Sequence, residues 1–147
     1  MGNEPKNNPI DSAAEWHIAE LVLKITVEGD ERNLVQKNLM LIKANSPADA
    51  YDKAIILGNE HAMSYQNPHG KQVHIQFIGL SRLNAVYDRL EDGAELLYEE
   101  YVGVSDEQIR ELVVPKHLLE PFRNVESSRP DYSSAEVLRE ASKLVEP

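Results

Sequence analysis

The chain has 147 residues and a formal net charge of -10 at pH 7, so it is long enough for a sizeable core and too acidic to favour nucleic acid or an anionic membrane as a partner. It contains no cysteine, which excludes disulfides, thiolate metal sites and thiol catalysis. No apolar segment resembles a signal peptide or a membrane span, so we expect a cytoplasmic protein.

Two long strands are predicted near the start of the chain, after a polar leader over residues 1–14 that we expect to be disordered. From Trp16 to Glu28 apolar residues alternate with polar ones, and the odd positions would face a core. A connector rich in turn formers leads to a second strand over residues 34–44. Because this strand carries apolar side chains on both faces, we expect it inside the sheet or covered on both sides.

A helix is predicted from Ser46 to about Met63. Ser46 would cap it, Pro47 fits the first turn, and Asp49 would lie near the positive end of the helix dipole. Small and apolar residues then recur at helical spacing, which predicts a stripe packed against the sheet.

The central stretch, residues 73–102, predicts two strands joined by an ordered excursion. Alternation over residues 73–78 indicates the first strand, which ends at Gly79 before a polar break. The pair Asp92-Gly93 predicts a tight turn. In a second strand over residues 94–102, Glu95 and Glu99 would point the same way, about 13 Å apart.

Shorter helices are predicted toward the C-terminus. Ser105 is a typical N-cap for a helix that Pro115 interrupts, and the segment PKHLLEPF can form another short helix. Residues 123–147 would form a polar linker followed by an amphipathic helix over residues 134–145. So short a helix is marginal in water and would need a docking surface.

These elements predict a single α+β domain over residues 15–122. Its four-stranded, mainly antiparallel sheet would follow the order β-β-α-β-β-α, with one helix packed on a face. One helix cannot cover both faces, and the second face is half apolar. Either the C-terminal helices or a second subunit would cover it, and a symmetric homodimer is the commonest arrangement.

The segment GLSRLNAVYDRLEDGAELLYEE, with SYQNPHGK and WHIAELVLKITVEGD before it, resembles the bacterial domain of unknown function 4288 family. The similarity extends from about Trp16 to Phe122. It implies a compact α+β domain and transfers no catalytic residue. The resemblance singles out six residues as important for the domain, if only for its structure: Tyr87, Asp88, Asp92, Gly93, Tyr98 and Glu99.

Evidence for chemistry in the sequence is sparse. The five histidines lack the helical spacing of ordinary zinc sites, and we find no phosphate loop, nucleophile elbow or dinucleotide fingerprint. We therefore expect no metal and no cofactor. If the two segments of the central stretch pair, Tyr87, Asp88, Tyr98, Glu99 and Glu100 could supply acid-base chemistry. The alternative is that these acids are solvated edge protection.

Negative charge is concentrated between residues 88 and 111, where the sequence has nine acidic residues and two arginines. Such a surface can capture a basic partner, although it can also serve solubility alone. The sequence thus favours a noncatalytic interaction module for a basic protein, such as an immunity or antitoxin-like inhibitor. Alternatives are a ligand-binding protein or enzyme with a Tyr/Asp/Glu pocket, and a structural oligomeric domain. The candidate binding residues are Tyr87, Asp88, Asp92, Glu95, Tyr98 and Glu99.

Overall fold

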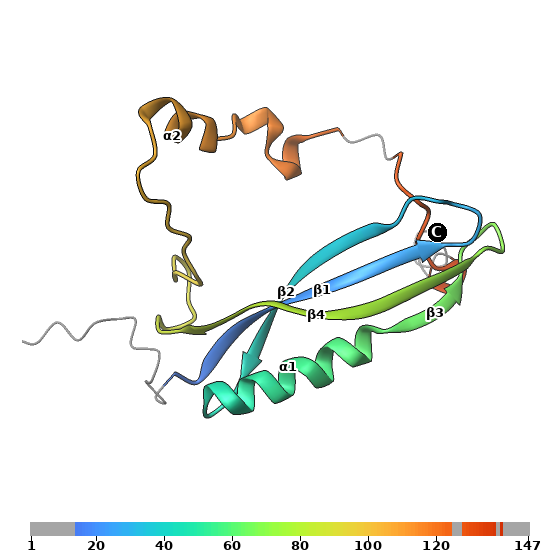
Figure 1. Ribbon diagram of the computed structural model, residues 1–147, viewed down its shortest axis with the longest axis horizontal. Helices are drawn as coiled ribbons and strands as arrows, with labels where there is room; N and C mark the ends of the chain where they lie inside the picture. Colours follow the sequence, from blue (N-terminus) through green and yellow to red (C-terminus); the bar gives the residue numbers. More distant parts are fainter. Residues whose placement is uncertain (1–13, 125–127, 138, 140–147) are drawn as a thin grey trace, which may run out of the picture. The chain divides into compact units, whose positions relative to one another are not determined.

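The computed structural model describes residues 14–124, 128–137 and 139 of the chain (Figure 1). It has an antiparallel sheet of four strands in the spatial order β2-β1-β4-β3, which confirms the predicted α+β class. The elements are β1 (Trp16–Val27), β2 (Leu34–Lys43), α1 (Pro47–His61), β3 (Met63–Gln66), β4 (Gln72–Val86), α2 (Asp106–Leu112) and the 3₁₀ turns η1 (Lys116–Leu118) and η2 (Glu120–Phe122).

The chain divides into two units. The first, which we call the sheet unit, contains residues up to Leu97 and from Pro130 onward; the second, which we call the arm, contains residues 98–129. The single domain predicted over residues 15–122 thus spans parts of both units. Of the predicted leader, only Ala14 is described, and it is buried. Of the C-terminal helix predicted over residues 134–145, residues 135–137 and 139 are helical and Ser134 is not, and the other residues lie outside the described part of the chain.

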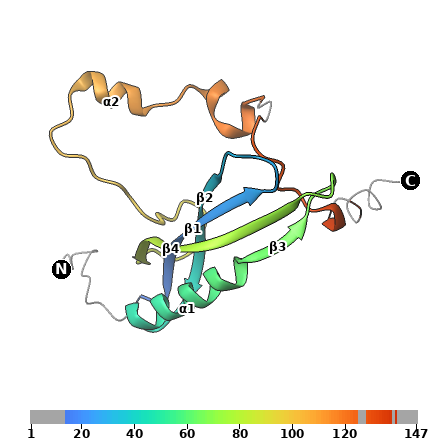
Figure 2. The same cartoon turned by 45° about the vertical axis from the view of Figure 1, so that its right-hand side comes forward.

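One face of the sheet is covered by α1, which lies along β4 in both views (Figures 1 and 2). The approach is close because α1 presents small residues: Ala50 and Ala54 are fully buried, and a Cβ added at Gly58 would lie 2.4 Å from the ring of Phe77. The helix begins as predicted, since Ser46 Oγ accepts a hydrogen bond from Asp49 N at 3.0 Å. It ends at His61, slightly earlier than expected.

The last two strands differ from the prediction in position. β4 continues past Gly79 to Val86, because two register shifts against β1 carry it through the predicted polar break. β-bulges insert extra residues and so reverse the alternation of faces. The remaining strand of the sheet is β3, in a segment where the sequence predicts the end of the helix and a turn. The strand predicted over residues 94–102 is wrong, since these residues have no regular structure.

The second strand is also placed differently. β2 pairs with β1 alone and forms an edge of the sheet, so the expectation of an interior strand is wrong. Its even positions face α1, as the buried Ile42 shows by packing with Ala50 and Ala54. Its odd positions point to the other face, where Val35 and Leu39 are exposed. Apolar residues on both faces of β2 therefore indicate an uncovered surface.

Candidate functional site

Four of the six predicted binding residues, Tyr87, Asp88, Asp92 and Glu95, lie in the loop that follows β4. Asp88 Oδ2 accepts a hydrogen bond from Glu95 N at 3.1 Å, which closes the loop on itself. Inside it, Ala94 N donates to Glu91 O at 3.0 Å, and Gly93 has a φ of 83°. The predicted Asp92-Gly93 turn is therefore present, and the Asp88 carboxylate helps to hold the loop in shape.

The other two predicted residues, Tyr98 and Glu99, belong to the arm. Glu99 Oε2 accepts a hydrogen bond from the hydroxyl of Tyr101 at 2.8 Å. The hairpin that would have placed these residues beside Asp88 is not formed. The six residues therefore follow one another along an irregular segment and do not share a pocket within one unit.

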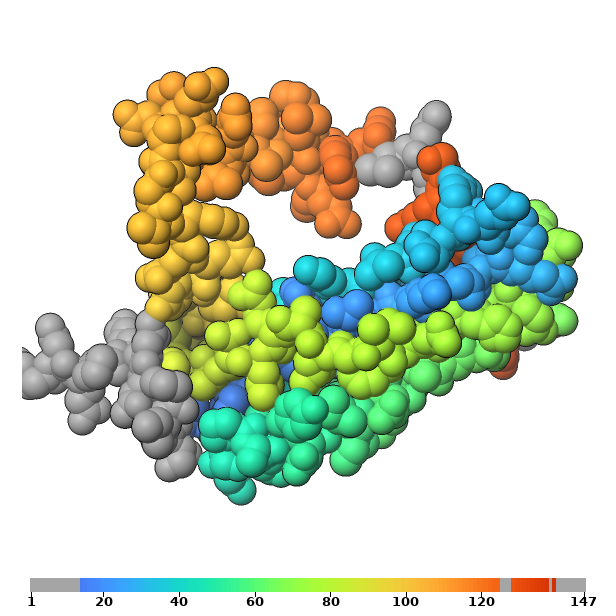
Figure 3. Space-filling model, in the orientation of Figure 1, coloured from blue at the N-terminus to red at the C-terminus, as the bar shows by residue number. Residues whose placement is uncertain are grey.

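The arm exposes its apolar side chains. Apart from Val104, every described arm residue is exposed, and α2 buries none of its seven residues. In Figure 3 the arm is a slender chain, coloured yellow to orange, without a packed centre. Ten large apolar side chains of the arm are exposed: Tyr98, Tyr101, Val102, Ile109, Leu112, Val113, Val114, Leu118, Leu119 and Phe122.

The start of α2 is nevertheless well encoded. Ser105 Oγ accepts from Gln108 N at 3.2 Å, while Gln108 Oε1 accepts from Ser105 N at 3.1 Å, so the predicted capping box is present. Caps of this kind contribute about 1 kcal/mol, which cannot by itself sustain a helix shorter than about 12 residues. A surface that buries the apolar side chains of the arm would stabilise it.

A second candidate surface is the sheet face opposite α1, which we call the open face. It exposes Val35 (58%), Leu39 (55%) and Leu41 (46%) of β2, and Ile78 (60%), which follows Phe77 in β4. Strand register places Lys24, Lys37, Lys43 and Arg82 on the same face. Among the strand residues on this face, Glu20 is the one that carries a carboxylate. Its Oε1 lies 4.0 Å from Lys37 Nζ and accepts a hydrogen bond from Ser81 Oγ at 2.6 Å.

The C-terminal segment from Pro130 binds at the β3 end of the sheet. Tyr65 donates its hydroxyl proton to the carbonyl oxygen of Tyr132, and Asn67 Nδ2 donates to Asp131 O at 3.1 Å. Burial raises the pKa of Tyr65, and the neighbouring Tyr132 and Asp131 act in the same direction. Tyr132 packs beside Val27 and Val73, so this segment extends the layer of α1 and leaves the open face uncovered.

Asn67 holds this junction together, and sequence reasoning missed its role. The side chain is 3% exposed, and its Oδ1 accepts from His69 N at 3.0 Å and Lys71 N at 2.9 Å. Hydrogen bonds from Ser133 lower the pKa of Asp131, as does, to a smaller extent, His69, whose Nε2 lies 3.8 Å from the carboxylate. The Asn-Pro-His-Gly signal indicated a turn only, since a turn motif carries no information about a distant segment.

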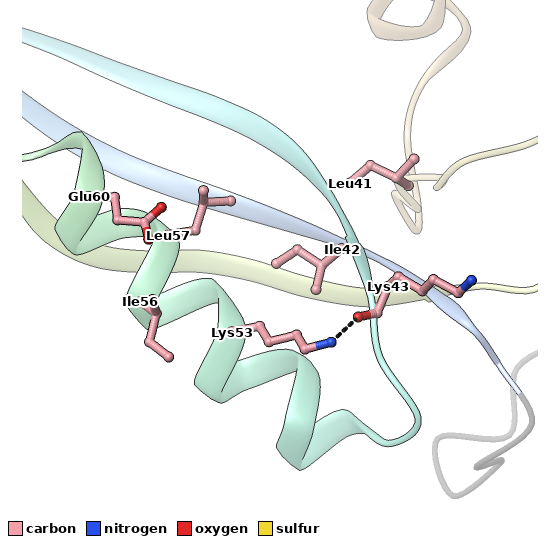
Figure 4. Close-up of a pocket in the computed structure, with 7 residues that line it drawn as sticks. All are labelled: Leu41, Ile42, Lys43, Lys53, Ile56, Leu57 and Glu60. Carbon is pink, nitrogen blue, oxygen red and sulfur yellow. Dashed lines mark hydrogen bonds between the residues drawn. The ribbon is translucent and has the colours of Figure 1, made fainter.

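A shallow pocket of about 300 Å³ lies between β2 and α1 (Figure 4). Lys53 Nζ points across it and donates a hydrogen bond to Lys43 O at 2.7 Å. The amine is thereby engaged by the protein itself, and the remaining lining is mostly apolar. The pocket could accept a small apolar group. Its lining residues are Leu41, Ile42, Lys43, Lys53, Ile56, Leu57 and Glu60.

The surroundings of two histidines, His74 and His17, differ from those of a catalytic histidine. His74 Nδ1 lies 2.7 Å from Ser64 Oγ, but both side chains are exposed on adjacent strands, and serine catalysis also needs donors for a developing oxyanion. His17 is buried, with neither ring nitrogen hydrogen-bonded to a described residue. Burial lowers its pKa, and the charge of Asp49 opposes this shift. Neither arrangement amounts to a catalytic site.

Searches for two other kinds of site gave negative results within the described part of the chain. We find no group of three or more His, Asp or Glu side chains there that could hold a metal ion. None of the described helices has both the length and the apolar composition required to cross a bilayer.

Comparison with known proteins gives one match. The family model described as Domain of unknown function (DUF4288) matches residues 16–98. The match begins with β1 and ends at the first residue of the arm, short of the Phe122 suggested by the resemblance. No curated protein and no solved structure matches the chain.

Proposed function

The chain belongs to the DUF4288 family, whose function is unknown. From the surfaces of the chain itself, we propose that it is a noncatalytic module that binds another protein through its arm. The observation that carries this proposal is the exposure of nearly every described arm residue, apolar ones included. Monomeric proteins rarely leave large apolar surfaces in water, and such surfaces commonly bind a partner.

Charge favours a partner with a basic surface. The sequence of the arm carries seven carboxylates, those of Glu99, Glu100, Asp106, Glu107, Glu111, Glu120 and Glu126, against four cations, those of Arg110, Lys116, Arg123 and Arg129. Complementary charge speeds encounter and selects orientation, while the apolar side chains supply most of the binding free energy. An inhibitor that covers a basic active site, as an immunity protein or antitoxin does, is one concrete form of this function.

The alternative of a ligand-binding protein or enzyme with a Tyr/Asp/Glu pocket has less support. Its proposed residues are divided between the loop after β4 and the arm, and the pocket beside α1 has other lining residues. A purely structural oligomeric domain remains compatible with the exposed surfaces, but it gives no role to the excess of acids in the arm.

The test is retention of a partner from lysate at low salt by the full chain. An acid-reversed variant, Glu95→Lys/Glu100→Lys/Glu111→Lys, should lose a basic protein that the wild type retains. The matched control, Glu31→Lys/Asp52→Lys/Glu60→Lys, makes the same change in charge at exposed positions outside the loop and arm, and it should retain the partner. Equal retention by both variants, or no partner at all, would refute binding of a foreign basic protein.

A further inference from the structure

The open face exposes apolar side chains of β2 and β4, although Ile18 and Val86, near its Trp16 end, are buried. Val35, Leu39, Leu41 and Ile78 are between 46% and 60% exposed, whereas the opposite face is sealed by α1. The described part of the C-terminal segment does not cover it, because Tyr132 packs on the α1 side. An apolar sheet face of this kind is expected to bind something.

The charge on this face restricts what can bind. Four cationic side chains lie among the apolar residues, in a protein whose net charge is -10. Two carboxylates are near them: Glu20 lies 4.0 Å from Lys37 Nζ, and Glu15 lies 3.0 Å from Lys43 Nζ. Two open faces packed against each other would bring lysines of one copy close to lysines of the other, which is unfavourable. The occupant should therefore be both apolar and acidic.

The arm has this chemistry. It exposes ten large apolar side chains, and its sequence has seven carboxylates against four cations. Its short helix also needs a surface on which to dock. A second copy of the chain therefore offers an occupant with the required chemistry.

We propose that the arm of one copy lies on the open face of a second copy, and that the second arm reciprocates, which forms a twofold dimer. This inference rests on the proposed function, because it names the partner of the arm. A reciprocal exchange is closed, since both complementary surfaces of each copy are used and no further chain can add. The acidic side chains of each arm then face Lys24, Lys37 and Lys43 of the other copy.

The first test is the molar mass of the full chain by light scattering. The wild type should have twice the 16.6 kDa of one chain. An arm-reversed variant, Glu100→Lys/Glu111→Lys/Glu120→Lys, and a face-reversed variant, Lys24→Glu/Lys37→Glu/Lys43→Glu, should each be monomeric. The control Glu31→Lys/Asp52→Lys/Glu60→Lys should remain a dimer, and circular dichroism establishes that every variant folds.

Mixing the two reversed variants gives the decisive result. The reversed arm of one chain meets the reversed face of the other, and the remaining arm and face are wild type, so both contacts are complementary again. A heterodimer should form at concentrations where each variant alone is monomeric. A mixture that stays monomeric, or reversals that leave the wild-type dimer intact, would overturn the proposal.

Because the chain has no cysteine, single cysteines can locate the contact. Leu112→Cys in one chain and Leu39→Cys in another should be joined by a short bismaleimide when the two are mixed. Asp52→Cys on the exposed side of α1 should not join to Leu112→Cys. Cross-linking to Asp52→Cys at an equal rate would contradict the assigned face.

The outcomes separate this inference from the proposed function. A monomeric wild type that retains a basic protein through its arm would overturn the dimer and support the function. A dimer with the properties above and no retained foreign protein would limit the function of the arm to self-association. A monomer whose arm and face cross-link within one chain would refute the exchange of arms.

Discussion

Two buried polar side chains differ in how their polar atoms are satisfied. Asn67 uses its amide for three side-chain hydrogen bonds, and these connect the turn after β3 with the segment around Asp131. His17 is buried with no such bonds to the described residues. Buried polar groups stabilise a fold when they are paired and cost free energy when they are not. We therefore expect opposite effects from removing them.

Replacing Asn67 by Ala should lower the free energy of unfolding by about 3 kcal/mol, since three buried hydrogen bonds of about 1 kcal/mol each are lost. Urea unfolding of the full chain measures this change. Asn67→Asp keeps an oxygen acceptor for the backbone amides of His69 and Lys71 but loses the donor to Asp131 O. Its free energy of unfolding should therefore fall by less than that of Asn67→Ala. Wild-type stability in Asn67→Ala would show that these bonds contribute nothing.

His17 should make stability depend on pH. Burial lowers its pKa from 6.5 in the folded state, so the unfolded chain binds a proton more readily. Stability should be full above pH 6.5 and should fall as the pH decreases toward the folded pKa. Thermal melts between pH 7.5 and 5 test this, and His17→Leu should flatten the profile. A profile that keeps its slope in His17→Leu would assign the effect to another group.

At the scale of helices and strands, the sequence predicted those features that depend on residues close together in the chain. The alternation of β1, the Ser46 cap of α1 and the capping box of α2 were all recognisable, because each depends on residues close in sequence. The bulges of β4 were not predictable, since they arise from pairing with β1. The alternation over residues 94–102 suggested a strand, but in the described structure no strand pairs with it.

The contact between α1 and β4 gives a prediction at this scale. Gly58→Ala would gain helix propensity of about 1 kcal/mol, but its Cβ would lie 2.4 Å from the ring of Phe77. We expect a net loss of about 1–2 kcal/mol from overpacking. Adding Phe77→Leu should restore part of this loss, and a double-mutant cycle by urea unfolding measures the coupling. Additive effects would show that the ring moves aside freely.

At the scale of the whole molecule, the candidate surfaces could be predicted only in part. The excess of acids between residues 88 and 111 was evident from the sequence, and so was the half-apolar second face. The basic character of the open face was not evident, because Lys24, Lys37 and Arg82 come from three strands whose register brings them together. A surface built from residues far apart in the sequence can be recognised only once the fold is known.

Both ends of the arm are joined to the sheet unit, since Leu97 precedes the arm and the segment from Pro130 is held by Tyr65 and Asn67. The arm is therefore a loop held at both ends and not a tail, so a protease that cuts it once should produce no free fragment under native conditions. Trypsin cleavage after Arg110 or Lys116 should give two pieces that elute together and separate only in denaturant. Release of the C-terminal piece without denaturant would show that the anchor at Pro130 is weak. A single cut should thus open the loop and leave the sheet intact.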